Sequence, residues 1–166
     1  MIHSIVDSPI GDLLLIGDGE RLTALYTAEN ARRPEVTGPR EDGAFAIARA
    51  QLAEYFAGIR REFDLELAPR GTDFQLQIWA ELVRIPFGET TSYRGLAERI
   101  GNPNAVRAVG MANGRNPISI VVPCHRVIGS DGTLTGYAGG LAAKAWLLAH
   151  EAAGQPAAAA VAAFAS

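Results

Sequence analysis

The pattern of apolar and polar positions changes near residue 70. Before that point, short apolar stretches are separated by the turn signals Ser8–Gly11 and Gly17–Gly19, and this pattern predicts an antiparallel meander. The predicted strands are residues 2–6, 13–16 and 22–26. A loop is expected over 31–42. Apolar residues then recur at helical spacing from Phe45 to Phe56, and residues 62–67 alternate apolar and acidic positions, which predicts a returning strand.

After residue 70 the spacing is that of helices. Thr72 followed by Gln75 is a capping-box signature, and it predicts a helix that ends before Pro86. Further helices are expected over 92–100, 104–113 and 141–150, and a buried β-like run over 118–122. The predicted fold class is α+β: a small N-terminal domain of antiparallel sheet plus helix, then a mainly helical C-terminal domain with a helix-turn-helix. The expected boundaries are 1–70, 71–155 and a flexible Ala-rich tail over 156–166.

Composition narrows the class of protein. The chain has 166 residues, of which 48% are hydrophobic, so it has enough apolar side chains for a core. Its longest apolar runs are too short to span a bilayer, and no charged-then-apolar leader opens the sequence. These features predict a soluble, cytoplasmic protein without a membrane partner.

Charge is distributed unevenly. The net charge of -3 argues against a wholly basic nucleic-acid binder. However, residues 1–92 are strongly acidic, whereas residues 93–127 hold five arginines and one acid. This basic block coincides with the two helices broken at Gly101–Pro103, which form either an ordinary helical hairpin or a helix-turn-helix. The smooth surface around Arg107 favours the DNA-binding alternative, because small side chains let a helix approach DNA closely.

The chain contains a single cysteine, Cys124, directly before His125. One thiol excludes an intramolecular disulfide and a multi-cysteine zinc cluster. A thiol becomes a nucleophile when a base or a positive charge favours the thiolate. From these residues alone, a thiol hydrolase, a redox sensor, a thiol transferase and a merely buried cysteine all remain open.

A family resemblance separates these alternatives. The chain resembles the methylated-DNA–protein-cysteine methyltransferases (O6-alkylguanine-DNA alkyltransferases) over roughly residues 71–151. The motifs that carry the resemblance are IPFGE at 85–89, SY at 92–93, RAVG at 107–110, NP at 116–117, PCHRV at 123–127 and GYAGG at 136–140. The N-terminal unit fits the family only in length and in the order of its elements, and its residues predict a structural support.

The resemblance implies transfer of an alkyl group from O6 of guanine to Cys124. It implies that His125 deprotonates Cys124 through a bridging water, that Glu151 orients His125, and that Tyr93 donates a proton to the leaving guanine. Asn116 is then expected to organise the turn under the cysteine. The expected base pocket comprises Tyr93, Val127, Tyr137, Ala138 and Lys144. The family often has serine where this chain has Ala138, which predicts a change in pocket selectivity but not a loss of transfer.

The same resemblance implies that double-stranded DNA is the partner. The target nucleotide is flipped out of the duplex, Arg107 fills the vacated place, and the second helix lies in the minor groove, where reading is nearly sequence-blind. The expected DNA-binding residues are Val106, Arg107, Ala108, Gly110, Arg115 and Arg126.

The expected product is a thioether, which no residue here hydrolyses, so each monomer would act once. No cofactor and no metal are expected. A helix-turn-helix regulator and a non-catalytic lesion binder remain as alternatives, and O4-alkylthymine remains open as a second substrate.

Overall fold

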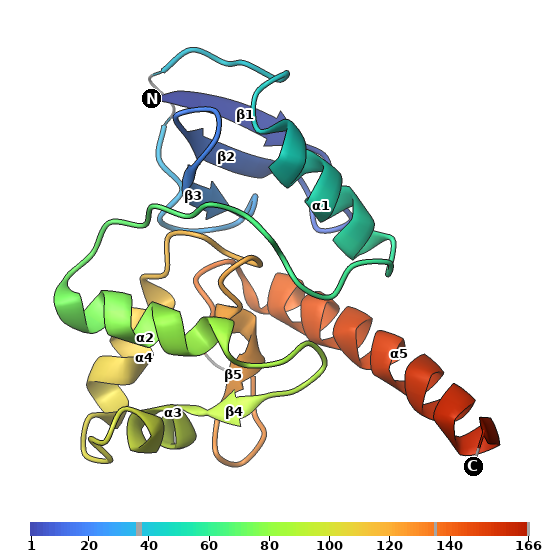
Figure 1. Ribbon diagram of the computed structural model, residues 1–166. Coiled ribbons are helices and arrows are strands. Elements are labelled where there is room, and N and C mark those ends of the chain that lie inside the picture. Colours follow the sequence, from blue (N-terminus) through green and yellow to red (C-terminus); the bar gives the residue numbers. More distant parts are fainter. Residues whose placement is uncertain (36–37, 135, 166) are drawn as a thin grey trace.

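The N-terminal part is a three-stranded antiparallel sheet covered by one helix (Figure 1). The computed structural model describes residues 1–35, 38–134 and 136–165, and their side chains as far as Gly154. The strands β1 (Ile2–Val6), β2 (Leu13–Gly17) and β3 (Leu22–Tyr26) lie in the order β1-β2-β3. The predicted meander is therefore confirmed, because its turn signals fall between the strands.

Helix α1 (Ala46–Phe56) packs on this sheet through its buried residues, among them Leu52 and Tyr55. The strand predicted over 62–67 does not form. Instead, the amide of Gln51 in α1 donates to the carbonyl of Asp64 and accepts from its N–H, at 3.0 and 2.9 Å. These bonds occupy backbone groups that a neighbouring strand would need, and pairing with the sheet is limited to a bridge between Leu22 and Leu67.

The second half of the chain is mainly helical, as predicted. Helix α2 (Asp73–Val83) begins at the predicted capping box, in which Thr72 and Gln75 bond each other's backbone N–H. Helices α3 (Tyr93–Arg99) and α4 (Val106–Gly114) pack against each other and against α2. They form the predicted helix-turn-helix, but the connection between them is residues 100–105, twice the length of the expected three-residue turn 101–103.

The apolar run 118–122 is buried as predicted, but it is not a strand. Its chain folds back on itself, because the N–H of Val122 donates to the carbonyl of Ile118 at 3.0 Å, and Ile120 has a positive φ of 72°. Only Ile118 forms a β-bridge, and its partner is Leu25 of β3. This bridge joins the N-terminal sheet to the segment that leads to Cys124.

Two short parallel strands and the last helix complete the fold. Strand β4 (Thr91–Ser92) pairs with β5 (Val127–Ile128). The 3-10 helix η1 (Cys124–Arg126) lies directly before β5, after the folded-back segment 118–122. Helix α5 (Leu141–Ala165) begins between the two halves of the molecule and extends away from both (Figure 1). Helix α5 continues beyond the predicted helix end at residue 150. The flexibility predicted for the tail 156–166 is not tested and stays a prediction. Among the described residues, no helix has the length and apolar character needed to cross a membrane.

Candidate active site

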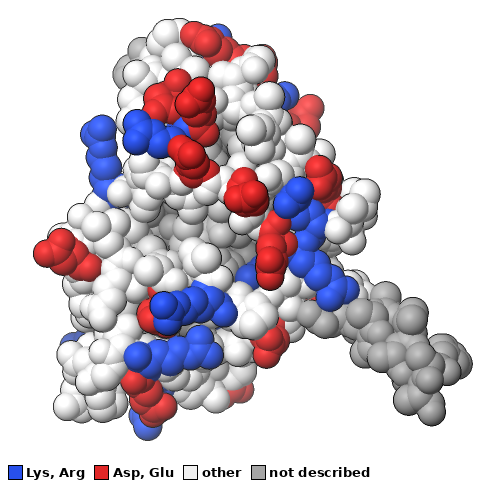
Figure 2. Space-filling view, viewed as in Figure 1, with Lys and Arg blue, Asp and Glu red and all other residues white. Residues whose placement is uncertain are grey.

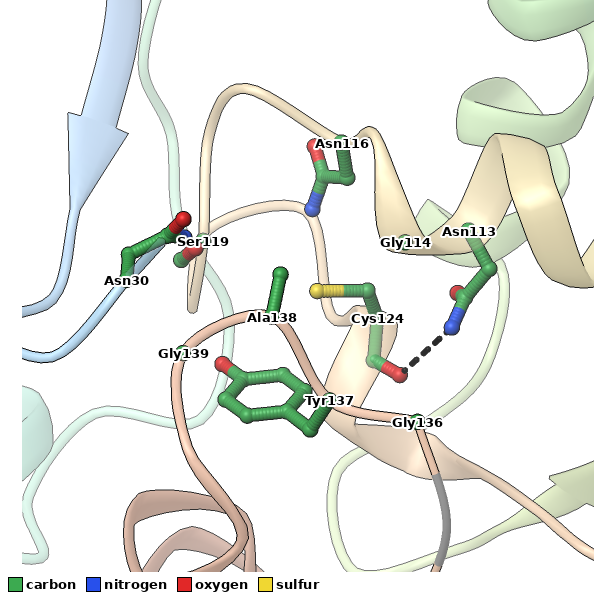
Figure 3. A pocket seen from close by; sticks show the side chains of 10 residues that line it. All are labelled: Asn30, Asn113, Gly114, Asn116, Ser119, Cys124, Gly136, Tyr137, Ala138 and Gly139. Carbon is green, nitrogen blue, oxygen red and sulfur yellow. Dashed lines mark hydrogen bonds between the residues drawn. The ribbon is translucent and has the colours of Figure 1, made fainter. Parts of the chain in front are cut away.

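Cys124 opens η1 and lines a small pocket (Figure 3). Its side chain is buried, with 5% of the residue exposed. The pocket is formed by three parts of the chain: the β3–α1 connection, the segment from the end of α4 to Cys124, and the loop before α5. The lining residues are Asn30, Asn113, Gly114, Asn116, Ser119, Cys124, Gly136, Tyr137, Ala138 and Gly139. The predicted pocket residues Tyr137 and Ala138 thus lie beside Cys124.

The turn that presents Cys124 is built around Asn116. Its amide nitrogen donates to the carbonyls of Val122 and Ile118, at 2.8 and 3.3 Å, and its amide oxygen accepts from the N–H of Ile118 at 3.1 Å. Asn113 adds a bond to the carbonyl of Cys124 at 3.4 Å, drawn in Figure 3. A short polar side chain that bonds its neighbouring backbone is a common way to fix a non-repetitive turn.

His125 and Glu151 form a direct pair in the interior. The Nε2 atom of His125 lies 2.7 Å from Oε2 of Glu151, and both residues are at most 1% exposed. An ionised carboxylate only accepts hydrogen bonds, so Nε2 carries the proton and Nδ1 is left with a lone pair. Nδ1 has no hydrogen-bond partner among the residues whose side chains are described. Nδ1 therefore keeps a lone pair that can accept a proton.

Two further residues bind the same carboxylate. Arg126 donates to both oxygens of Glu151, at 2.7 and 3.0 Å, and the hydroxyl of Tyr55 donates to Oε2 at 2.6 Å. Burial by itself would raise the pKa of Glu151, but the hydrogen bonds and charges of His125 and Arg126 hold it well below its usual range. At neutral pH Glu151 is thus ionised and can only accept hydrogen bonds.

Burial also decides the protonation of the two neighbouring groups. It raises the pKa of the Cys124 thiol, against the opposing effects of the Asn116 amide and the Lys144 charge. It lowers the pKa of His125, although the hydrogen bond to Glu151 acts in the opposite direction. Both groups are therefore neutral at rest, and a proton has to pass from the thiol to a base before the sulfur becomes a strong nucleophile.

Lys144 and Val127 lie behind the pocket. The ammonium of Lys144 donates to the carbonyl of Val127 at 2.7 Å and lies 5.9 Å from the centroid of the Tyr137 ring. Both residues are fully buried. Neither belongs to the wall of the pocket in this conformation. Lys144 acts on the site through its charge, which favours the thiolate form of Cys124.

Tyr93 lies beside the pocket lining because of the β4–β5 pairing. Ser92 pairs with Ile128 and also caps α3 by accepting from the N–H of Gly95 at 2.9 Å, so Tyr93 begins α3 beside the end of η1. A methyl group placed on Gly136 would lie 3.8 Å from the Tyr93 hydroxyl oxygen. The Tyr93 hydroxyl and the pocket wall are therefore neighbours.

Helix α4 presents the smooth basic surface that the sequence predicts. Arg107, Ala108 and Arg115 are exposed, and Val106 and Gly110 are partly buried. On the face shown in Figure 2, many of the acidic side chains lie over the N-terminal part, in agreement with the excess of acidic residues over 1–92. The helix-turn-helix segment differs from the N-terminal part in its scarcity of acidic side chains, since residues 93–127 contain a single acid.

Arg126 corrects one expectation. The sequence placed it among the DNA-binding residues, but it is 6% exposed and its guanidinium is committed to Glu151 and to the carbonyl of Ile85, at 2.6 Å. A buried cation is retained where it is paired, because an unpaired charge in the interior is costly. Arg126 belongs to the His125–Glu151 cluster and not to the protein surface.

Comparisons with known proteins agree with this geometry. A family model described as "6-O-methylguanine DNA methyltransferase, ribonuclease-like domain" matches residues 1–69, and "6-O-methylguanine DNA methyltransferase, DNA binding domain" matches residues 73–153. A methylated-DNA–protein-cysteine methyltransferase of Mycobacterium tuberculosis is 54% identical over 159 residues, which are 95% of this chain and 96% of that protein.

The chain belongs to the 6-O-methylguanine DNA methyltransferase family. A methyltransferase of the same name from Methanosarcina barkeri is 50% identical over 91% of this chain and 97% of that protein. The crystal structure of Mycobacterium tuberculosis OGT in complex with DNA superposes with a TM-score of 0.88 at 51% identity, covering 93% of this chain and 94% of that one. The predicted family and fold class are confirmed.

Two contributions of the N-terminal part to this methyltransferase site were missed from the sequence. Tyr55 bonds Glu151, and the β3–α1 connection supports the loop before α5: the N–H of Ala31 donates to the carbonyl of Ala138 at 3.3 Å, and Thr27 donates to that of Gly139 at 3.3 Å. In the sequence Tyr55 occupies an ordinary core position of an amphipathic helix, so no local signal marks it. The N-terminal part is more than a remote support.

Proposed function

We propose that this protein repairs DNA by moving an alkyl group from O6 of guanine to the sulfur of its own Cys124, once per molecule. The observation that carries the proposal is the buried Cys124–His125–Glu151 arrangement in a chain of this family. A soft alkyl carbon is attacked well by a thiolate, and a neutral histidine oriented by a carboxylate is a suitable base for the thiol.

The proposed reaction proceeds as one displacement with balanced protons. The thiol proton passes to Nδ1 of His125 through a bridging water, and the imidazolium formed is stabilised by Glu151. The sulfur then forms a bond to the alkyl carbon while the carbon–O6 bond breaks, and the electron pair goes to the guanine. Tyr93 gives the guanine a proton. Exchange with solvent afterwards takes the extra proton from His125 and returns one to Tyr93.

The proposed DNA contact uses α4 in the minor groove. Arg107 fills the place of the flipped nucleotide, Ala108 and Gly110 allow close approach, and Val106 and Arg115 flank them. Flipping costs a few kcal/mol, which the inserted side chain and the backbone contacts offset. Tyr137 and Ala138 line the pocket for the flipped base, with Val127 and Lys144 behind it. We further propose that the protein acts as a monomer in the cytoplasm, without a cofactor.

A labelled substrate tests the proposal. Duplex DNA carrying O6-[³H-methyl]guanine is incubated with the protein, and the label on each residue is located by peptide mapping. We expect one methyl group per protein chain, on Cys124. The Cys124→Ser variant should bind the same duplex without accepting label. Label on another residue contradicts the assignment of Cys124 as the acceptor. Many turnovers per chain contradict the one-transfer mechanism and favour a thiol hydrolase instead.

Arg107→Ala tests the DNA contact separately. Its exposed side chain makes the substitution neutral for folding, and we expect slower repair of duplex DNA with little change for a free O6-alkylguanine base. Equal rates on duplex DNA for this variant and the unchanged protein would remove Arg107 from the flipping step.

A further inference from the structure

Tyr55 is the one contact to Glu151 that comes from the first 70 residues among the described side chains. It lies on α1, is fully buried, and its hydroxyl donates to Oε2 of Glu151 at 2.6 Å. That same oxygen accepts from Nε2 of His125 at 2.7 Å. One carboxylate oxygen therefore joins a helix of the N-terminal part to the base of the active site.

The hydroxyl of Tyr55 is held rigidly. Its ring packs edge-on against Phe56, Phe87 and His150, with centroids 5.2, 6.1 and 5.2 Å away. Its backbone carbonyl accepts a hydrogen bond from Nε2 of His150 at 2.7 Å, which ties α1 to α5 one residue before Glu151. Burial and the adjacent carboxylate raise the pKa of Tyr55, so the hydroxyl keeps its proton and stays a donor.

The arrangement at Glu151 leaves little freedom to the carboxylate. Arg126 binds both oxygens, and the N–H of Gly88 lies 3.4 Å from Oε1. On the other side, Oε2 is shared by Tyr55, His125 and one Nη of Arg126. Among the described residues, removing the Tyr55 donor leaves Arg126 as the only other donor to the oxygen that orients His125.

We propose that Tyr55 is a positioning residue of the alkyl transfer: by donating to Oε2 of Glu151 it fixes the carboxylate against His125 and limits how strongly that carboxylate holds the imidazole proton. The proposal rests on the proposed function, in which His125 is the base. It assigns to the N-terminal part a role in the chemistry of Cys124, through the Tyr55–Glu151–His125 contacts.

The sign of the electrostatic effect follows from the groups around the pair. Glu151 faces His125 and Arg126 of η1, Tyr55 of α1 and the N–H of Gly88, and the charge of Lys144 in α5 also acts on His125. The cations stay in place when the Tyr55 hydroxyl is removed. Oε2 then concentrates more charge on His125, which favours the imidazolium and so makes the base available only at higher pH.

The experiment compares Tyr55→Phe with the unchanged protein and with Tyr26→Phe as the matched control. Tyr26 is a half-buried tyrosine of β3 that makes no contact with Glu151 among the described side chains. Single-turnover rates of methyl transfer are measured with excess protein on a duplex carrying O6-methylguanine, between pH 5.5 and 9. Protein concentration is varied so that DNA binding and the rate at saturation are obtained separately.

For Tyr55→Phe we expect about a tenfold lower rate at saturation, by analogy with the low end of the loss seen when the outer hydrogen-bond partner of a metal-bound histidine or carboxylate is removed. DNA affinity should stay within about twofold, and the acid limb of the pH–rate profile should move to higher pH. Tyr26→Phe should match the unchanged protein. An unchanged rate and profile for Tyr55→Phe overturns the proposal, and so does a slower rate with an unmoved acid limb, which is what loosened packing alone would give.

A second variant keeps the test decisive if Tyr55→Phe does not fold. A fluorotyrosine introduced only at position 55 preserves the ring and makes the hydroxyl a stronger donor, so the acid limb should move to lower pH, opposite to Tyr55→Phe. An unmoved or oppositely moved limb overturns the proposal. If the unchanged protein itself transfers no methyl group, the proposed function fails, which is distinguishable from failure at Tyr55 alone.

Discussion

Replacing Arg126 by methionine separates a buried structural cation from a DNA-binding one. The substitution keeps most of the apolar stem but removes the guanidinium that donates to both oxygens of Glu151 and to the carbonyl of Ile85. Glu151 is 1% exposed, so solvent does not replace the lost donors. His125 and Tyr55 are then left as side-chain partners of a charge that has lost its cation.

The expected loss of stability is large. Breaking a buried ion pair by removing one partner costs about 3–5 kcal/mol in free energy of unfolding. For a chain of this size that corresponds to a fall of roughly 6–20 °C in Tm. Substitution of the exposed Arg107 by alanine, the matched control, should change the free energy of unfolding by no more than about 0.5 kcal/mol.

Two measurements decide between the roles. Urea unfolding followed by tryptophan fluorescence gives the stability, since Trp79 is buried and its indole N–H donates to the carbonyl of Ala112 at 2.8 Å. Duplex binding at several salt concentrations counts the phosphate contacts. A surface arginine on a phosphate would lower the salt slope by about 1 when removed. Near-native stability of Arg126→Met together with such a reduced slope would refute the buried role.

The other predictions concern the capping box, the cysteine turn and the buried histidine. Thr72→Ala should lower the free energy of unfolding by about 1 kcal/mol without altering the transfer rate at saturation, measured by urea unfolding and single-turnover kinetics. Asn116→Ala should destabilise by about 2–3 kcal/mol and slow transfer, because three hydrogen bonds hold the turn; equal transfer rates would exclude its organising role. The pKa of His125 is lowered in the folded protein. Below about pH 6.5 the unfolded chain therefore takes up a proton that the folded chain does not. As pH is lowered through this range, the free energy of unfolding should fall by up to about 1.4 kcal/mol per pH unit. The lowered pKa of Glu151 adds a second loss of stability below about pH 4.5, because the stabilisation from the ionised carboxylate is complete above that pH and is lost as pH falls. Unfolding curves between pH 3 and 8 test both effects. Constant stability from pH 8 to 5 would contradict the effect of His125.

The two strand predictions that failed share a cause. Residues 62–67 and 118–122 have the apolar spacing of strands, but side-chain amides of Gln51 and Asn116 take up nearby backbone groups and hold these segments in other conformations. Hydrophobic periodicity records which positions are buried, and it carries no information about which polar group satisfies the backbone there.

The sequence alone determined the elements and the chemistry that depend on near neighbours. Turn residues place the strands of the meander, the capping box begins α2, and the PCHRV motif identifies Cys124 and His125 through the family it resembles. These features act within a few residues, where the chain's own connectivity brings the groups together. They can therefore be predicted without the tertiary structure.

The tertiary structure decided which partners complete the site. In the sequence, Arg126 is one basic residue of a basic block, but in the structure it binds Glu151, which lies 25 positions away. Tyr55 has the spacing of a core aromatic residue, but it donates a hydrogen bond to the same carboxylate from 96 positions away. A buried charge must be paired, and the packing of the whole core determines which residue lies close enough to pair with it. The local sequence thus identified the nucleophile, whereas the tertiary fold supplies the environment in which that nucleophile can react.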